Sequence, residues 1–236
     1  LQDELTFDDL ISFCREEKIT PTVIHEISTY VDKLPQKKQI FELQKQHSID
    51  FLKKVRTLFL ILKKLDSAKI DYVILKGISV SFFYPSPEMR FFSDLDVLVD
   101  ETNIHKTYKI LKQCGFKYAK PGILDSTEGS RNYSRHLPEM INDENVIIEL
   151  HHRVTSPVTY KICPLVDLCM KNKVKKIFFG TSVNILPPDL AFAVLAYHGV
   201  DQFKKPIELR FLFDLYMTGM HLNKDETLLI EKYKKI

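Results

Sequence analysis

The sequence of 236 residues lacks most of the motifs that identify an enzyme at sight. It contains no Walker-type loop, no Gly-x-Gly-x-x-Gly fingerprint and no zinc-ligand spacing. No serine lies in a nucleophile-elbow context, and no cysteine has an evident histidine partner. These absences argue against a catalytic triad, a phosphate-binding loop of the Walker type, a dinucleotide fold and a zinc centre.

Cysteine is scarce, and the cysteines present show no Cys-x-x-Cys spacing. All four lie in apolar or helical contexts: Cys14, Cys114, Cys163 and Cys169. Buried free thiols are therefore expected rather than disulfides or zinc ligands, which fits a reducing cytoplasm. The sequence also has no basic-then-apolar leader and no apolar run long enough to span a bilayer, so no membrane partner is expected.

Charge of one sign is not in large excess. The chain has 34 Lys and Arg against 31 Asp and Glu, a net charge of +3, and 44% hydrophobic residues, as in ordinary soluble globular proteins. This weak basicity argues against nucleic acid as a partner or substrate. The basic run at 171–176 predicts a solvated connector between a helix and a strand rather than a phosphate site.

The hydrophobic period divides the chain into three parts. Apolar residues recur at helical spacing up to residue 68, and Pro21 suits the start of a helix there. Short β-rich runs then alternate with helical stretches, and the helical pattern returns beyond Pro187-Pro188. We therefore predict an N-terminal helical segment (1–68), an α/β core with a short mixed sheet (69–186) and a C-terminal helical segment (187–236).

Within the core, the pattern predicts strands and helices in alternation. The expected strands cover 71–75, 94–99, 115–119 and 146–151, and the expected helices cover about 79–84 and 102–114. A loop is expected at about 121–132 because Gly, Ser and Asn are frequent there. The segment 135–140 is expected to form a hairpin with 146–151.

Two carboxylates stand two residues apart in an apolar run, at Asp94 and Asp96. Because side chains alternate along a strand, both carboxylates would project from one face. Such a pair is repulsive, and a divalent cation relieves the repulsion while bridging to substrate phosphates. The alternative is two solvated acids at the end of a strand.

A third acid, Glu149, lies in the middle of the apolar strand expected at 146–151. An unpaired carboxylate there would be costly, so it should lie at an edge, pair with a base or bind metal beside Asp94 and Asp96. The alternative is a structural ion pair with Arg153 or a lysine. His151 shares the face of Glu149 and is expected to support the site as a neighbouring partner.

Lys76-Gly77 lies where a strand gives way to a helix. Glycine lets the backbone approach a phosphate closely, Lys76 supplies positive charge and Ser79 supplies a hydroxyl. The alternative is an ordinary turn. A triphosphate-binding role is favoured by the order of the elements. They follow one another as strand, Lys-Gly turn, helix, loop and then the Asp-x-Asp strand.

The order of motifs resembles the nucleotidyltransferase superfamily of the DNA polymerase β type, and most closely its branch of bacterial uncharacterised nucleotidyltransferases. The resemblance covers about residues 50 to 220. Its motifs are Leu75-Lys76-Gly77, Arg90, Asp94-Leu95-Asp96-Val97-Leu98-Val99, His136-Leu137-Pro138, Glu149-Leu150-His151, His198, and Arg210 with Asp214. Two features depart from the wider superfamily: Ile78 rather than serine follows Gly77, and the gap from Gly77 to Asp94 is longer than usual.

The resemblance implies a polymerase β-like α/β core flanked by helices. It also implies transfer of a nucleoside monophosphate from an NTP, ATP first among them, to an acceptor with release of pyrophosphate, using Mg²⁺ or Mn²⁺. Asp94, Asp96 and Glu149 would hold the metal, and Glu149 could act as a base. The acceptor stays open among protein, peptide, sugar and small molecule, and a catalytically silent nucleotide-binding or antitoxin-like module of the same fold is the alternative.

The motifs of the resemblance also include basic residues outside the acidic cluster. Arg90 is a candidate for phosphate charge, the alternative being an ion pair with Glu88 or with the Asp pair. His136, His198 and Arg210 are candidates for supporting or substrate contacts. Arg210 and Asp214, four residues apart on an expected helix, would more commonly form a structural pair.

Overall fold

The computed structural model describes residues 5–120, 135–155, 165–201 and 206–223. The loop expected at about 121–132, Cys163 and the tail beyond residue 223 lie outside these ranges. Within the described ranges the chain forms helices on both faces of a seven-stranded mixed sheet, which confirms the predicted α/β class. None of the described helices has the combination of length and apolarity needed to cross a membrane.

The central strands of the sheet bring the predicted acids together. In the strand order β3-β4-β5-β2-β1-β7-β6, β2 lies between β5, which is parallel to it, and β1, which is antiparallel. The parallel register places Asp96 directly opposite Glu149. The strand bounds are β1 (Tyr72–Ile74), β2 (Asp94–Val99), β3 (Lys117–Tyr118), β4 (Met140–Ile141), β5 (Ile147–His151), β6 (Val174–Phe178) and β7 (Thr181–Ile185).

The four predicted strands and the predicted hairpin between β4 and β5 are confirmed. The antiparallel pair β6 and β7 adds two strands at the other edge, and only a strand after residue 176 was expected there. Exposed Lys175 and Lys176 on edge strand β6 suit a strand that must not pair with another chain.

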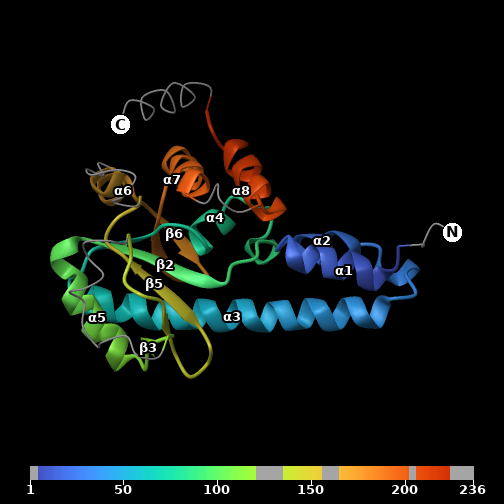
Figure 1. The fold of residues 1–236 in the computed structure, drawn as a ribbon, viewed down its shortest axis with the longest axis horizontal. Helices are drawn as coiled ribbons and strands as arrows, with labels where there is room; N and C mark the ends of the chain where they lie inside the picture. Colours follow the sequence, from blue (N-terminus) through green and yellow to red (C-terminus); the bar gives the residue numbers. More distant parts are fainter. Residues whose placement is uncertain (1–4, 121–134, 156–164, 202–205, 224–236) are drawn as a thin grey trace.

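Helices cover the sheet on both sides, as Figure 1 shows: α3 and α5 lie on one face, and α4, α6, α7 and α8 lie on the other. Their bounds are α1 (Phe7–Glu16), α2 (Thr20–Ser28), α3 (Lys37–Ser67), α4 (Ile78–Ser81), α5 (Ile104–Gln113), α6 (Leu165–Asn172), α7 (Pro188–Asp201) and α8 (Leu209–Gly219). Short 3₁₀ turns occur at Val31–Lys33, Pro87–Met89 and Glu101–Asn103.

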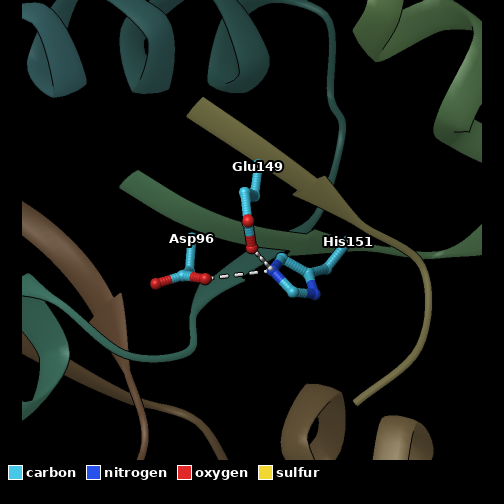
Figure 2. Close-up of side chains that lie close together, drawn as sticks. All are labelled: Asp96, Glu149 and His151. Carbon is cyan, nitrogen blue, oxygen red and sulfur yellow. Dashed lines mark hydrogen bonds and ion pairs between the residues drawn. The ribbon is translucent and has the colours of Figure 1, made fainter. Parts of the chain in front are cut away.

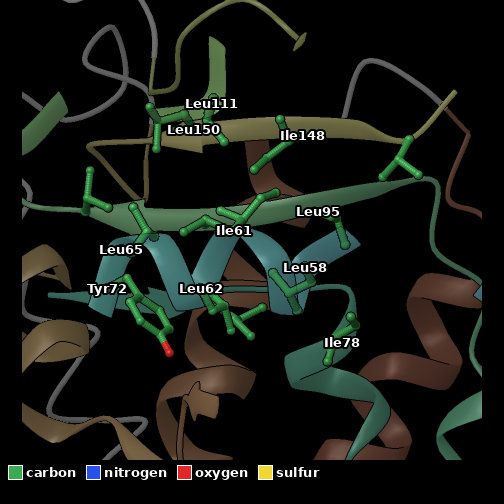
Figure 3. Packing of buried hydrophobic residues seen from close by; sticks show 14 of the residues in the cluster. Leu58, Ile61, Leu62, Leu65, Tyr72, Ile78, Leu95, Leu111, Ile148 and Leu150 are labelled. Carbon is green, nitrogen blue, oxygen red and sulfur yellow. The ribbon is translucent and has the colours of Figure 1, made fainter. Parts of the chain in front are cut away.

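The main apolar core lies between α3 and the sheet (Figure 3). Buried residues of α3 such as Leu58, Ile61 and Leu65 recur at helical spacing and pack against alternate residues of the strands. Leu95, Val97 and Val99 of β2 belong to this core. Because side chains alternate, Asp94 and Asp96 must face the opposite side, which α7 and α8 cover.

The N-terminal helices form a smaller apolar cluster of Ile11, Ile24, Val31 and Ile40. Helix α3 has 31 residues, about 46 Å, and joins this cluster to the main core. The second half of the predicted segment 1–68 therefore packs into the same core as the sheet.

Candidate functional site

A cavity of about 460 Å³ opens above the carboxylate face of the sheet. Its walls come from distant parts of the chain: the end of α1, the turn after β1, strands β2 and β5, and helices α7 and α8. The lining includes the predicted residues Lys76, Gly77, Arg90, Asp94, Asp96, Glu149, His198 and Arg210, together with Lys18, Arg135, Phe211 and Asp214.

Asp96, Glu149 and His151 form the centre of the site (Figure 2). The Nε2 atom of His151 lies 3.0 Å from Oδ1 of Asp96 and 3.2 Å from Oε2 of Glu149. All three residues are buried, and their potential ligand atoms lie within 4.8 Å of one another. Two carboxylates and an imidazole nitrogen at this spacing fit a divalent cation.

Asp94 lies beside this cluster rather than within it. Its side chain is half-buried on the wall of the same cavity, and the Ser93 hydroxyl donates to its Oδ1 at 3.1 Å. The three predicted carboxylates thus face one cavity, but the tight cluster consists of Asp96, Glu149 and His151. His151, expected as a neighbouring partner, touches both buried acids directly.

Electrostatics at the centre keep the buried acids ionised. Burial acts to raise the pKa of Asp96, but the charge of Lys76 and the hydrogen bond from His151 hold that pKa well below its ordinary value. Burial also opposes ionisation of Glu149, yet the hydrogen bond from His151 together with the charges of His151 and His136 lowers the pKa of Glu149. Burial and then the charge of Asp96 raise the pKa of Asp94. The site therefore holds carboxylates of unequal basicity within one cavity.

Lys76 pairs with the central acid. Its Nζ atom lies 2.9 Å from Oδ1 of Asp96, the same oxygen that His151 contacts. Both Lys76 and His151 thus compensate the Asp96 charge. The expected phosphate-binding lysine is at the cavity, where a bound triphosphate would compete with Asp96 for its charge.

The turn after β1 requires glycine. Gly77 has a φ of +53°, and a Cβ atom there would stand 3.3 Å from the carbonyl oxygen of Asp94. Gly77 lies on the cavity wall, whereas Ser79 does not line it. Ser79 is fully buried, and its hydroxyl accepts a hydrogen bond from the Leu186 N–H at 3.2 Å. The structure therefore gives Ser79 a structural contact instead of the expected contact with phosphate.

Arg90 is committed to an internal partner. Its Nε and Nη2 atoms donate to the two carboxylate oxygens of Asp214, both at 2.7 Å, and both residues are buried. The expected pairing with Glu88 or the Asp pair is wrong, because the partner lies on α8. The fork of the guanidinium is occupied by Asp214, Arg90 also lines the cavity, and its expected contact with phosphate stays a prediction.

Of the predicted histidines, His136 lies beside the acidic cluster and His198 lies on the cavity wall. His136 Nε2 is 3.7 Å from Glu149 Oε2, and its ring centre is 5.0 Å from that of His151. His198 of α7 lines the cavity, and burial, followed by the charges of Lys76 and Arg135, lowers its pKa far below the usual value. His198 is therefore a neutral imidazole.

Arg210 forms the expected structural pair, with Nη1 at 3.5 Å from Asp214 Oδ2, and also bonds Glu208 at 3.0 Å. Glu208 in turn accepts from Lys18 Nζ at 2.6 Å. Lys18 follows α1, adopts a φ of +57° and lines the cavity. Lys18 and Arg135 were not identified from the sequence, because neither belongs to a local motif.

The site and the fold together define a class of protein. A mixed α/β sheet carries acids on neighbouring strands, with a Lys-Gly turn beside them and helices above them, as the resemblance to nucleotidyltransferases predicts. The family model of the uncharacterised nucleotidyltransferases matches residues 3–231. The chain therefore belongs to that family, as the resemblance predicted.

Two solved structures resemble this chain. The solution structure of the antibiotic-resistance factor ANT(2'')-Ia has a TM-score of 0.55 and 9% identity, covering 78% of this chain and 92% of that one. A nucleotidyltransferase-like antigenic protein from Paracoccidioides brasiliensis has a TM-score of 0.47 and 20% identity, covering 72% and 75%. The first of these shares the overall fold of this chain. A search among curated proteins gives no match.

Proposed function

We propose that this protein transfers a nucleoside monophosphate group from an NTP, with ATP the first candidate, to an acceptor and releases pyrophosphate. The observation that carries the proposal is the position of Asp96 opposite Glu149 on parallel strands, with Asp94 on the wall of the same cavity. A divalent cation, Mg²⁺ or Mn²⁺, would bind these oxygens and offset phosphate charge.

Residues of the cavity would have separate roles in the transfer step. The acceptor nucleophile forms a bond to the α-phosphorus, and the bond from that phosphorus to the bridging oxygen of pyrophosphate breaks. Glu149 would receive the proton of the acceptor or share the cation. Lys76 and the backbone at Gly77 would hold the phosphates that leave.

The acceptor is expected to be a small molecule. The cavity of about 460 Å³ lies in the size range of small-molecule sites. The fold neighbour ANT(2'')-Ia is an antibiotic-resistance factor, and this function of the neighbour favours the same class of acceptor here. Apolar side chains on the helical wall, including Leu195, Phe211 and Leu215, could pack against the body of such a molecule.

Turnover is the direct test. The protein is incubated with each NTP, Mg²⁺ and a panel of small hydroxyl and amino compounds, and pyrophosphate and nucleotide adducts are measured by mass spectrometry. Glu149→Gln should stop both products, and Glu144→Gln, at an exposed position, should not. Nucleotide binding without any turnover in the wild-type protein would instead identify the catalytically silent module.

Lys76→Ala should weaken binding of an unreactive NTP analogue in the presence of Mg²⁺. The loss of one charge-assisted contact is expected to cost about 1–3 kcal/mol of binding free energy, measured by titration calorimetry. Lys109→Ala, on the exposed side of α5, is the matched control. If Lys76→Ala and the wild-type protein bound the analogue with equal affinity, Lys76 would have no role in binding phosphate.

A further inference from the structure

Arg90 links the turn at Lys76-Gly77 to helix α8. Besides its two bonds to Asp214, the guanidinium donates from Nη1 to the carbonyl oxygen of Gly77 at 3.0 Å and to that of Phe91 at 3.4 Å. One side chain therefore contacts a carboxylate from α8 and the backbone of the turn at the same time. Gly77 and Arg90 thus meet Asp214, which follows Arg90 by 124 residues in the sequence.

The contact with Gly77 fixes a particular peptide plane. Gly77 has φ +53° and ψ −112°, a combination that side-chain-bearing residues rarely adopt. A trans peptide is planar, so holding the Gly77 carbonyl also fixes the direction of the N–H that follows it. Lys76, which reaches Asp96, immediately precedes this peptide. The guanidinium thus holds the backbone between the central acid and α4.

The Asp214 carboxylate, on the α8 side of Arg90, is also held by a second partner. Oδ1 of Asp214 accepts from the Tyr84 hydroxyl at 2.8 Å as well as from Arg90, and Asp214 is 1% exposed. A buried pair of this kind contributes little net stability relative to apolar residues, because both charges lose their hydration. In some proteins a buried pair of this kind selects one conformation, and here that effect would apply to the turn that Arg90 holds.

We propose that Asp214 is a positioning residue for the Lys76-Gly77 turn and acts on it through Arg90. Helix α8 then contributes to the phosphate site through Asp214, although Asp214 itself does not contact phosphate. The inference rests on the proposed function only for its effect on nucleotide binding. Its effect on the turn itself is independent of any substrate.

The turn can be observed by a single NMR signal in the ligand-free protein. Lys76-Gly77 is the only Lys-Gly pair in the sequence, so labelling lysine carbonyls with ¹³C and glycine amides with ¹⁵N leaves one correlated amide. Asp214→Asn should shift and broaden this signal. Tyr84→Phe should leave it in place, because that change removes a bond to Asp214 but keeps the Arg90 pair.

If Asp214→Asn does not fold, Arg90→Lys is the second variant. It keeps the positive charge at position 90. The planar guanidinium of arginine binds both Asp214 oxygens and the Gly77 carbonyl at once. The compact ammonium group of a lysine cannot reproduce this geometry. It should therefore shift the Gly77 signal too. An unchanged signal in the folded Asp214→Asn protein, or in Arg90→Lys, overturns the proposal and leaves a merely structural ion pair.

The same variants report on the nucleotide. Affinity for an unreactive NTP analogue with Mg²⁺ should fall about tenfold in Asp214→Asn and stay within about twofold of wild type in Tyr84→Phe. A shifted Gly77 signal with unchanged affinity would refute the assignment of phosphate binding to the turn, which belongs to the proposed function, while the positioning by Asp214 would stand.

Discussion

Asp96→Asn is expected to lower nucleotidyl transfer by about a thousandfold or more. The substitution keeps the size of the side chain but removes the charge at the centre of the cluster formed with Glu149 and His151. A neutral amide is a poor ligand for a hard divalent cation compared with a carboxylate. The rate of pyrophosphate release at saturating NTP and Mg²⁺ measures the loss.

The matched control is Asp143→Asn, whose side chain is 92% exposed. It makes the same chemical change outside the site and should leave the rate within about twofold of wild type. Circular dichroism must show that Asp96→Asn is folded, because the change leaves Lys76 without its partner. A folded Asp96→Asn protein that retains most of the wild-type rate would contradict the proposed site.

Arg90→Met is expected to give the largest loss of stability. Removing the guanidinium leaves the buried carboxylate of Asp214 without its principal charge partner, which costs about 3–5 kcal/mol of the free energy of unfolding. For a chain of this size the melting temperature should fall by roughly 10 °C. Thermal unfolding followed by circular dichroism measures the change.

Arg56→Met provides the comparison at the surface. Arg56 is 67% exposed and pairs with Glu144 at 2.6 Å, so its loss should cost less than about 1 kcal/mol. Combining Arg90→Met with Asp214→Leu should recover much of the stability, because no unpaired charge then remains buried. A similar small effect of Arg56→Met and Arg90→Met would show that the buried pair is not important for folding.

The sheet could be predicted because its strands have simple internal patterns. In β2 the alternation of carboxylates with Leu95 and Val97 marks both the strand and its two faces. The same reasoning places Glu149 and His151 on one face of β5. Which strands are neighbours depends on pairing over long separations, and the residues of one strand do not specify it.

The supporting contacts of the site could not be predicted in the same way. Arg90 and Asp214 are 124 residues apart, and Lys18 and Glu208 are 190 apart. A lone basic or acidic residue carries no periodic signal, so only the folded chain identifies its partner. Ser79 illustrates the converse, since a suitable residue beside a phosphate turn can face inward to bond a neighbouring backbone amide.

The end of α1 has a practical consequence for dissecting the chain. The carboxylate of Glu17 accepts from the Leu209 N–H at 2.7 Å, and the Glu17 carbonyl accepts from the Arg210 N–H at 3.3 Å, so α1 caps the first turn of α8. A fragment that begins at α3, or one limited to 69–186, would lose this cap along with the Lys18 part of the cavity wall. The smallest active fragment is therefore expected to need both helical flanks, and trimming the protein to its sheet would yield a fold without a complete binding site.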